Sequence, residues 1–321
     1  MDIRHIVGLL LAALAATNTA WLILYHARGQ QVEALKARLA ELNQTLEKLA
    51  DQAKSLDEEN TRLLLQLEQA RKNYEKLLDL LRQADTATKA ALIEILAKLN
   101  NSITDLYIYV ASHTYYTPMV KALYRPGQVA DKVYEILGVP VYRPGAWQDD
   151  MKKLYNWTIK NIQYAPDHHF AALRSISYVN IEGKRYIDGF EVDITDNYIQ
   201  EPVETLLRGA GDCEDMAILL SSMYSIYLHG VGDAWVLCLL AKDFNHCMSI
   251  AHIKPNATYV LADPSVGFYT TSSDLRTALD QWLSFIGVRW DDLNRAIVFN
   301  GKVFHEGTPA DTINFIERLV R

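Results

Sequence analysis

The chain has 321 residues, enough for one globular domain with long extensions, and its formal net charge is −7. The acidic balance and the lack of a basic tract in the sequence exclude the usual signature of nucleic-acid binding, so we expect no nucleic-acid partner. Three cysteines are too few for a disulfide framework, and the pairing of Cys238 with Cys247 is left open.

The N-terminal stretch predicts a membrane anchor. Residues 6–25 carry no charged side chain and are long enough to span the hydrocarbon core. A cleaved signal peptide is the alternative, with Ala13–Ala15 as its cleavage motif, but apolar residues resume at Trp21–Tyr25 and favour a retained anchor over residues 1–28. Basic residues after the span favour a cytoplasmic C-terminal side, whereas the short N-terminal tail favours the opposite. We expect a single-pass membrane protein with an extracytoplasmic globular domain.

Residues 29–84 are predicted to form a coiled coil. Apolar residues recur at alternating spacings of three and four across residues 32–81, without Gly or Pro. Asn60 falls at an a position, where two asparagines can bond each other and favour a parallel dimer. The pattern therefore predicts a parallel homo-oligomer through residues 32–81, followed by a helical connector over residues 85–146.

A version of the protein that begins near Gln30 should be a dimer in solution, because a single helix would leave its apolar stripe exposed to water. Chemical crosslinking combined with mass measurement checks this expectation. A monomer at micromolar concentration would contradict the coiled-coil prediction.

The central motif of the chain is Gly211-Asp-Cys-Glu-Asp-Met-Ala217. Asp212 has the character of a helix N-cap, and Asp215 that of its capping-box partner, which places Cys213 at the first helical position. The helix that follows, residues 216–228, is apolar on nearly every face and is therefore expected in a domain centre. Unpaired N–H groups and the dipole at the helix tip favour a thiolate, which makes Cys213 a candidate nucleophile. The alternative is a small buried cysteine without a chemical role.

Three strands of an antiparallel sheet are expected after this helix, over residues 233–241, 246–253 and 258–262. A cysteine nucleophile needs a base, and that base needs an orienting acceptor. His246 and His252 point to one sheet face, and only one of them can reach Cys213. The turn between the last two strands pairs His252 with Tyr259, which leaves Asp263 diagonal to His246. We therefore predict that His246 is the base and Asp263 its orienter, with the Cys213 backbone N–H as an oxyanion donor.

These residues resemble the transglutaminase-like superfamily of papain-type cysteine enzymes. The resemblance covers about residues 148–265 and rests on the following segments: Gly211–Ala217, His246, Asp263–Pro264, Leu154–Tyr164 and Pro202–Leu207. It implies an α+β fold over residues 147–321, with a central helix packed on an antiparallel sheet. It also implies that Cys213, His246 and Asp263 form a catalytic triad.

The family hydrolyses peptide or amide bonds or transfers the acyl group to an amine, so the resemblance implies a peptide or protein substrate and no cofactor. Members often carry Ala-Trp directly after the histidine, where this chain has Cys247-Met248. That departure and the long tether favour an alternative, in which a catalytically retired domain binds a partner at the end of the rod. The intact set of cysteine, histidine and aspartate favours the enzyme.

No metal site is expected from residue spacing. The acidic residues of the region before the central motif lack the spacing of a calcium-binding loop: Asp188, Glu191, Asp193 and Asp196. The remaining histidines of the globular region have no spacing typical of zinc ligands: His168, His169, His229 and His305.

Overall fold

The structure is a computed structural model of the whole chain. It describes residues 72, 76, 79, 80, 86–114, 116–139, 141–167, 170–181, 183–242 and 245–320. The chain divides into two units, Met1–Glu59 and Asn60–Arg321, and all described residues belong to the second. The predicted anchor and nearly all of the predicted coiled coil lie outside the described residues, so both stay predictions. Within the described part, no helix is both long enough and apolar enough to cross a membrane.

The described part combines helices with a mainly antiparallel set of strands, which is the predicted α+β class. Its helices are α2 (Thr86–Thr114), α3 (Ala130–Leu137), α4 (Trp147–Asn161), α5 (Pro202–Arg208), α6 (Cys213–Tyr227), α7 (Leu275–Ile286) and α8 (Pro309–Val320). Its strands are β1 (Gln163–Tyr164), β2 (Phe170–Ile181), β3 (Lys184–Thr195), β4 (Ala210–Gly211), β5 (Gly232–Leu240), β6 (Asn245–Ile253), β7 (Thr258–Asp263), β8 (Phe268–Ser272), β9 (Arg295–Phe299) and β10 (Phe304–Gly307). Short 3₁₀ turns cover Pro118–Leu123, Pro126–Val129, Lys254–Asn256 and Trp290–Asp292.

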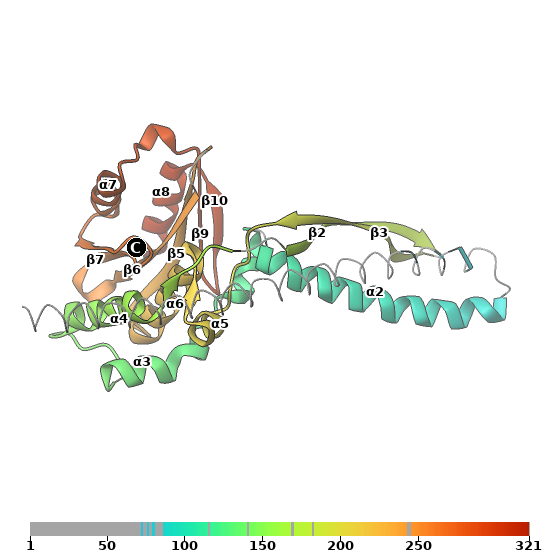
Figure 1. Cartoon of the computed structure of the whole chain (residues 1–321), viewed down its shortest axis with the longest axis horizontal. Coiled ribbons are helices and arrows are strands. Elements are labelled where there is room, and N and C mark those ends of the chain that lie inside the picture. Colours follow the sequence, from blue (N-terminus) through green and yellow to red (C-terminus); the bar gives the residue numbers. More distant parts are fainter. Residues whose placement is uncertain are drawn as a thin grey trace, which may run out of the picture. The chain divides into compact units, whose positions relative to one another are not determined.

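The hairpin of β2 and β3 lies alongside α2 (Figure 1). The Ile187 backbone N–H donates to the Asn100 side chain at 2.8 Å, so the hairpin and the helix are joined by a specific contact. The last turn of α2 is buried, and the His113 carbonyl accepts the Ile199 N–H at 2.6 Å. These contacts attach the C-terminal end of α2 to the globular part of the chain.

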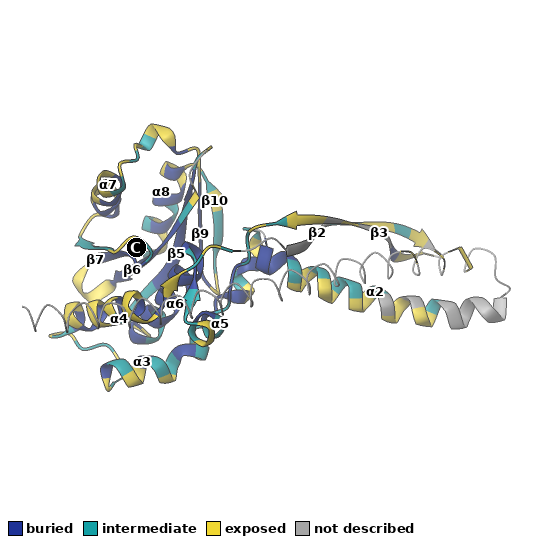
Figure 2. Cartoon of the chain, in the orientation of Figure 1, coloured by how far each residue is buried: buried dark blue, intermediate teal, exposed yellow. Residues whose placement is uncertain are grey.

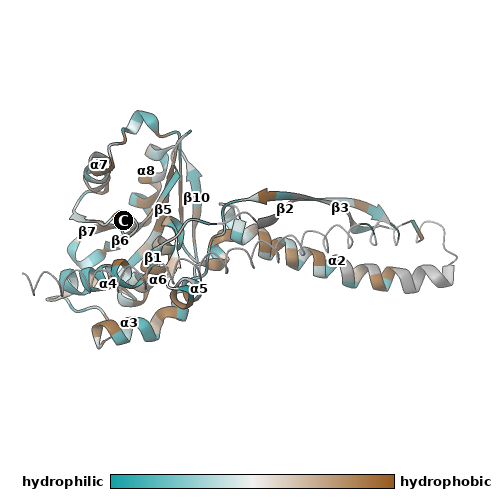
Figure 3. Cartoon of the chain, in the orientation of Figure 1, coloured by the Kyte–Doolittle hydropathy of each residue, from teal (hydrophilic) through white to brown (hydrophobic). Residues whose placement is uncertain are grey.

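A six-stranded antiparallel sheet forms the centre, in the order β10-β9-β5-β6-β7-β8. Its middle strands are buried along nearly their whole length (Figure 2) and are hydrophobic in Figure 3. The sequences of these strands are near-continuous apolar runs, because helices cover both faces of the sheet. The predicted turn register is confirmed, since His252 pairs with Tyr259 between β6 and β7.

Each face of the sheet carries its own helices. α6 packs on one face, where the Ser221 hydroxyl donates to Ser249 of β6 at 2.7 Å and is also within 2.9 Å of the Trp235 carbonyl oxygen. α7 and α8 pack on the other face, where Trp282 and Ile316 join the apolar core (Figure 1). Odd-numbered residues of β6 therefore face α6, and even-numbered residues face α7.

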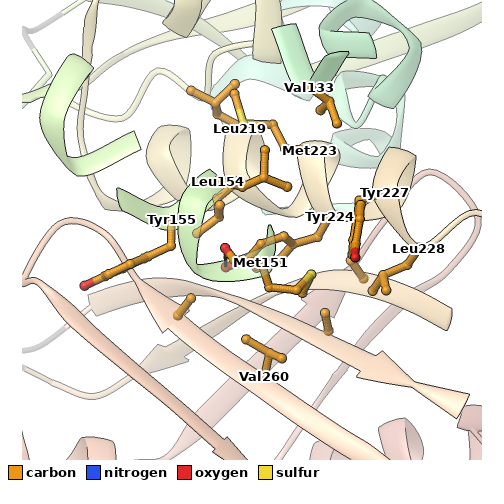
Figure 4. Packing of buried hydrophobic residues seen from close by; sticks show 14 of the residues in the cluster. Val133, Met151, Leu154, Tyr155, Leu219, Met223, Tyr224, Tyr227, Leu228 and Val260 are labelled. Atoms are coloured by element: carbon orange, nitrogen blue, oxygen red, sulfur yellow. Dashed lines mark hydrogen bonds between the residues drawn. The ribbon is translucent and has the colours of Figure 1, made fainter. Parts of the chain in front are cut away.

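The core beneath α6 also includes residues that precede the predicted domain boundary. Figure 4 shows Val133 of α3 packed with Leu219 and Met223 of α6, close to Leu154 of α4. The core on this face therefore begins within the predicted connector, before residue 147. The reason is that α6 is apolar on nearly all sides and needs more cover than α4 and the sheet supply.

One buried ion pair supports this core. Asp150 of α4 is fully buried and accepts from the Arg143 guanidinium and, at 2.9 Å, from the Tyr227 hydroxyl of α6. Burial raises the pKa of Asp150, but the hydrogen bonds from Arg143 and Tyr227 outweigh it and leave that pKa below its usual value. The carboxylate therefore links α4 to the C-terminal end of α6.

Asp150→Ala should destabilise the protein by about 2–3 kcal/mol, because it removes hydrogen bonds to a charged group and leaves the Tyr227 hydroxyl without an acceptor for its hydrogen. Urea unfolding of the purified protein measures the change. Asp149→Ala is the matched control, since Asp149 is the exposed neighbour on the same helix turn. Equal stability of the two variants would contradict the role given to Asp150.

Candidate active site

The tip of α6 is held in place by its N-cap. Asp212 and Asp215 form the predicted capping box, with the Asp215 carboxylate accepting the Asp212 N–H at 3.3 Å, and Cys213 is the first helical residue. The preceding loop is tied by the parallel pairing of Tyr164 with Gly211. A side chain at Gly211 would lie 2.6 Å from the Asp215 Cβ atom, so only glycine allows this close approach.

The thiol of Cys213 is almost buried, with 9% of the residue exposed, and it donates to Glu214 Oε2 at 3.2 Å. Burial raises the pKa of this thiol, and the carboxyl groups of Glu214 and Asp212 raise it further. A hydrogen bond from the Cys247 backbone N–H acts in the opposite direction but does not compensate. The helix tip was expected to favour a thiolate, and that expectation is wrong for this resting state, because burial and two carboxyl groups outweigh the dipole.

Three carboxyl groups lie close together at the N-terminal end of α6. Oxygen atoms of Asp167, Asp212 and Glu214 all lie within 4.8 Å of one another. Burial raises the pKa of Asp212 to about 9, with Glu214 as the next cause, and burial raises that of Asp167 to about 7. Such groups share protons at neutral pH or would accept a cation. Residue spacing in the sequence did not identify this carboxyl cluster, because Asp167 lies far along the chain from the Gly211–Ala217 motif.

His246 and Asp263 are brought together as predicted. His246 Nε2 lies 2.7 Å from Asp263 Oδ2, and the Trp282 indole N–H donates to the same oxygen at 2.8 Å. The Ser265 hydroxyl donates to the other oxygen at 2.7 Å. Burial raises the pKa of Asp263, but these hydrogen bonds outweigh it, with His246 the largest opposing cause, so the pKa lies below its usual value. Asp263 is therefore a buried, ionised partner for the imidazole.

The thiol and the imidazole approach the same peptide from different faces of the sheet. His246 lies on the face of α7, with its ring centroid 5.5 Å from that of Trp282. The next residue, Cys247, lies on the opposite face and shares a core cluster with Cys213. The structure thus places the thiol against the peptide between His246 and Cys247, with His246 as the second residue of its strand.

His252 is placed away from this centre, as expected. It is 6% exposed, and its ring packs on Tyr259 at a centroid distance of 4.7 Å. Burial lowers the pKa of His252, which is typical of an imidazole held neutral in a core. His252 lies six residues along β6 from His246.

Two neighbours of the thiol were not found from the sequence. Cys238 and Cys247 form a disulfide between directly opposed residues of β5 and β6, a pairing that the sequence left open. Tyr116, which follows α2, places its hydroxyl 3.5 Å from Cys247 Sγ, and burial raises its pKa, with Glu214 as the next cause. Only the tyrosine-rich composition around Tyr116 hinted at a different environment.

Comparisons with known proteins give a distant structural match. A crystal structure of a proposed cysteine protease from Cytophaga hutchinsonii matches with 13% sequence identity and a TM-score of 0.28. The match covers 61% of this chain and 59% of the length of that chain. No protein-family model matches this chain, and no curated protein matches it.

Alkylation of Cys213 by iodoacetamide should be slow at neutral pH and should accelerate about tenfold per pH unit, because the raised pKa keeps the thiol protonated. Glu214→Gln should accelerate labelling at a given pH, since it removes the carboxylate that accepts the thiol hydrogen. Glu191→Gln, at an exposed position of β3, is the control. Mass spectrometry measures the labelling rates. Rapid, pH-independent labelling near neutrality would contradict the electrostatic assignment.

Proposed function

We propose that this domain is a cysteine-nucleophile enzyme that acts on peptide or amide bonds, as a hydrolase or an acyl transferase of the papain type. The observation that carries the proposal is the His246–Asp263 pair, positioned at the peptide whose N–H contacts the Cys213 thiol. In this proposal Cys213 is the nucleophile, His246 is the base and Asp263 orients the imidazole. The remaining support comes from the energetics of the pair.

A buried carboxylate is costly to keep ionised, and Asp263 keeps its charge only because several groups donate to it. Such an arrangement fixes the imidazole tautomer and stabilises an imidazolium. Trp282 covers one side of the ring, so water has limited access to the pair. A merely structural histidine needs none of these features, as His252 illustrates by packing neutrally on Tyr259.

The protonated thiol defines how the reaction would begin. Cys213 would lose its proton to His246 as the sulfur attacks the carbonyl carbon, and the carbonyl oxygen would develop charge beside the Cys213 backbone N–H. The imidazolium would then protonate the departing amine. Water or a second amine would release the acyl group and restore the thiol. For this transfer the imidazole has to approach the thiol around the end of β6, where His246 lies.

A second function is favoured by one specific observation. The resting thiol bonds to Glu214 and lies on the sheet face opposite to His246. A domain retired from catalysis would tolerate that arrangement and would bind a partner instead. Labelling with a cysteine-directed peptide electrophile, with Cys213→Ala as control, separates the two functions.

The proposal also includes a membrane anchor and a parallel oligomer. We infer that residues 6–25 anchor the chain and that residues 32–81 pair it in parallel with a second copy. The globular domain would then act outside the cytoplasm on a peptide or protein substrate. These segments lie outside the described residues, and the proposal for them rests on sequence periodicity and hydropathy alone.

His246→Ala should lower the turnover of a fluorogenic peptide amide about 10²–10⁴-fold, because the thiol loses its base. Asp263→Asn should also lower turnover substantially, but less than His246→Ala does, since the imidazole loses its orientation and its stabilising charge. His252→Ala is the matched control and should leave turnover nearly unchanged, because that ring packs on Tyr259 away from the thiol.

Circular dichroism should report a folded protein for all three variants. Loss of turnover in His252→Ala but not in His246→Ala would overturn the assignment of the base. Wild-type protein without turnover and without labelling of Cys213 by a peptide electrophile would favour the binding module.

A further inference from the structure

All three cysteines of the chain meet at the tip of α6. Cys238 and Cys247 are bonded to each other across β5 and β6. Cys213 Sγ lies within 4.8 Å of Cys247 Sγ, so a free thiol and a disulfide are close neighbours inside one apolar cluster. That juxtaposition is the starting geometry for thiol–disulfide exchange.

Groups around Cys213 fit the requirements of such an exchange. Its thiol donates to Glu214 Oε2 at 3.2 Å, so a proton acceptor is already in contact with the sulfur. Glu214 is 2% exposed, and that proton can be held inside the protein. Burial and the nearby carboxyl groups raise the pKa of the Cys213 thiol, and a hydrogen bond from the Cys247 backbone N–H to the sulfur offsets part of that rise. The thiol is thus held between a base and the disulfide sulfur that it would attack.

We propose that Cys213 exchanges with the Cys238–Cys247 disulfide, so that the chain interconverts between a form with a free nucleophile and a form with a Cys213–Cys247 bond. The Cys213 thiol gives its proton to Glu214, and its sulfur attacks Cys247 Sγ. The bond between Cys247 and Cys238 breaks, and Cys238 leaves as a thiolate that takes up a proton. One thiol and one disulfide exist on each side of the reaction, so it needs neither oxidant nor reductant.

The sheet can accommodate both forms. Cys238 and Cys247 are directly opposed residues of paired strands, and neighbouring residues on both sides continue the ladder. Strand pairing therefore does not depend on the bond between the two sulfurs. Cys238 is fully buried within the same cluster as Cys213, so its released thiol stays beside the site and can reverse the exchange.

The consequence for activity rests on the proposed function, whereas the exchange itself does not. In the exchanged form the Cys213 sulfur is bonded and cannot attack a carbonyl carbon. The disulfide beside the site would then act as an internal, reversible block of the nucleophile. Reduction of the exchanged form would restore the free thiol.

Disulfide mapping of the full-length protein tests the exchange without any activity assay. The protein is incubated at neutral or alkaline pH, quenched with acid, unfolded and treated with N-ethylmaleimide at mildly acidic pH, which marks every free thiol. Trypsin is unsuitable, because Arg208 and Lys242 bracket Cys213 and Cys238 without a cleavage site between them. Pepsin digestion at low pH separates them while exchange is stopped.

In wild-type protein we expect maleimide on Cys238 together with a linked peptide that joins Cys213 to Cys247. Cys213→Ser removes the attacking sulfur, and maleimide on Cys238 should fall about tenfold or more. In Cys238→Ser, mild oxidation with diamide should join Cys213 to Cys247, since these are the two cysteines left. Maleimide on Cys213 alone in wild type, with no Cys213–Cys247 bond in Cys238→Ser, overturns the proposal.

The two proposals fail in different ways. Exchange without turnover toward any peptide amide would contradict the proposed enzyme but leave the sulfur chemistry established. Turnover that persists unchanged while maleimide marks only Cys213 would contradict the exchange and leave the enzyme. Both measurements use the same purified protein, so a folding defect in a variant cannot imitate either result in the wild type.

Discussion

The burial of α6 between the sheet and the helices α3 and α4 is the constraint on which the site depends. Thirteen of its fifteen residues are buried, and its Ser221 hydroxyl makes hydrogen bonds to both β5 and β6. A helix held on all sides cannot shift along its axis without breaking these contacts. Its first residue, Cys213, is therefore delivered to one point at the end of β6.

Two sets of carboxyl groups show how the environment decides charge. Asp263 accepts from an indole, a hydroxyl and an imidazole, and its pKa stays low although it is buried. Asp212 and Glu214 each keep a buried oxygen without a donor in the described structure, and their pKa values are raised. Negative charge is thus favoured on Asp263 beside His246, whereas the raised pKa values of Asp212 and Glu214 make these carboxylates stronger proton acceptors beside the thiol.

Alternation along β6 explains why the thiol meets a disulfide. Successive residues point to opposite faces, so when His246 turns toward Trp282, Cys247 has to turn toward α6. Cys247 therefore places its sulfur within 4.8 Å of the Cys213 thiol. The same geometric rule therefore supports both the proposed catalytic pair and the proposed exchange.

Local rules were enough to predict the capping box at Asp212, the position of Cys213 and the pairing of His252 with Tyr259. Each of these depends on hydrogen bonds within one helix turn or one hairpin, and residue spacing along the chain encodes them. The ionisation state of the thiol was beyond such rules, because it depends first on how deeply the packed elements bury Cys213. Local rules also could not predict the Cys238–Cys247 disulfide, or which sheet face holds the thiol and which holds the imidazole. These features follow from which side of the sheet α6 covers. Packing of whole elements sets that side, and the short-range pattern of apolar and polar residues is compatible with either.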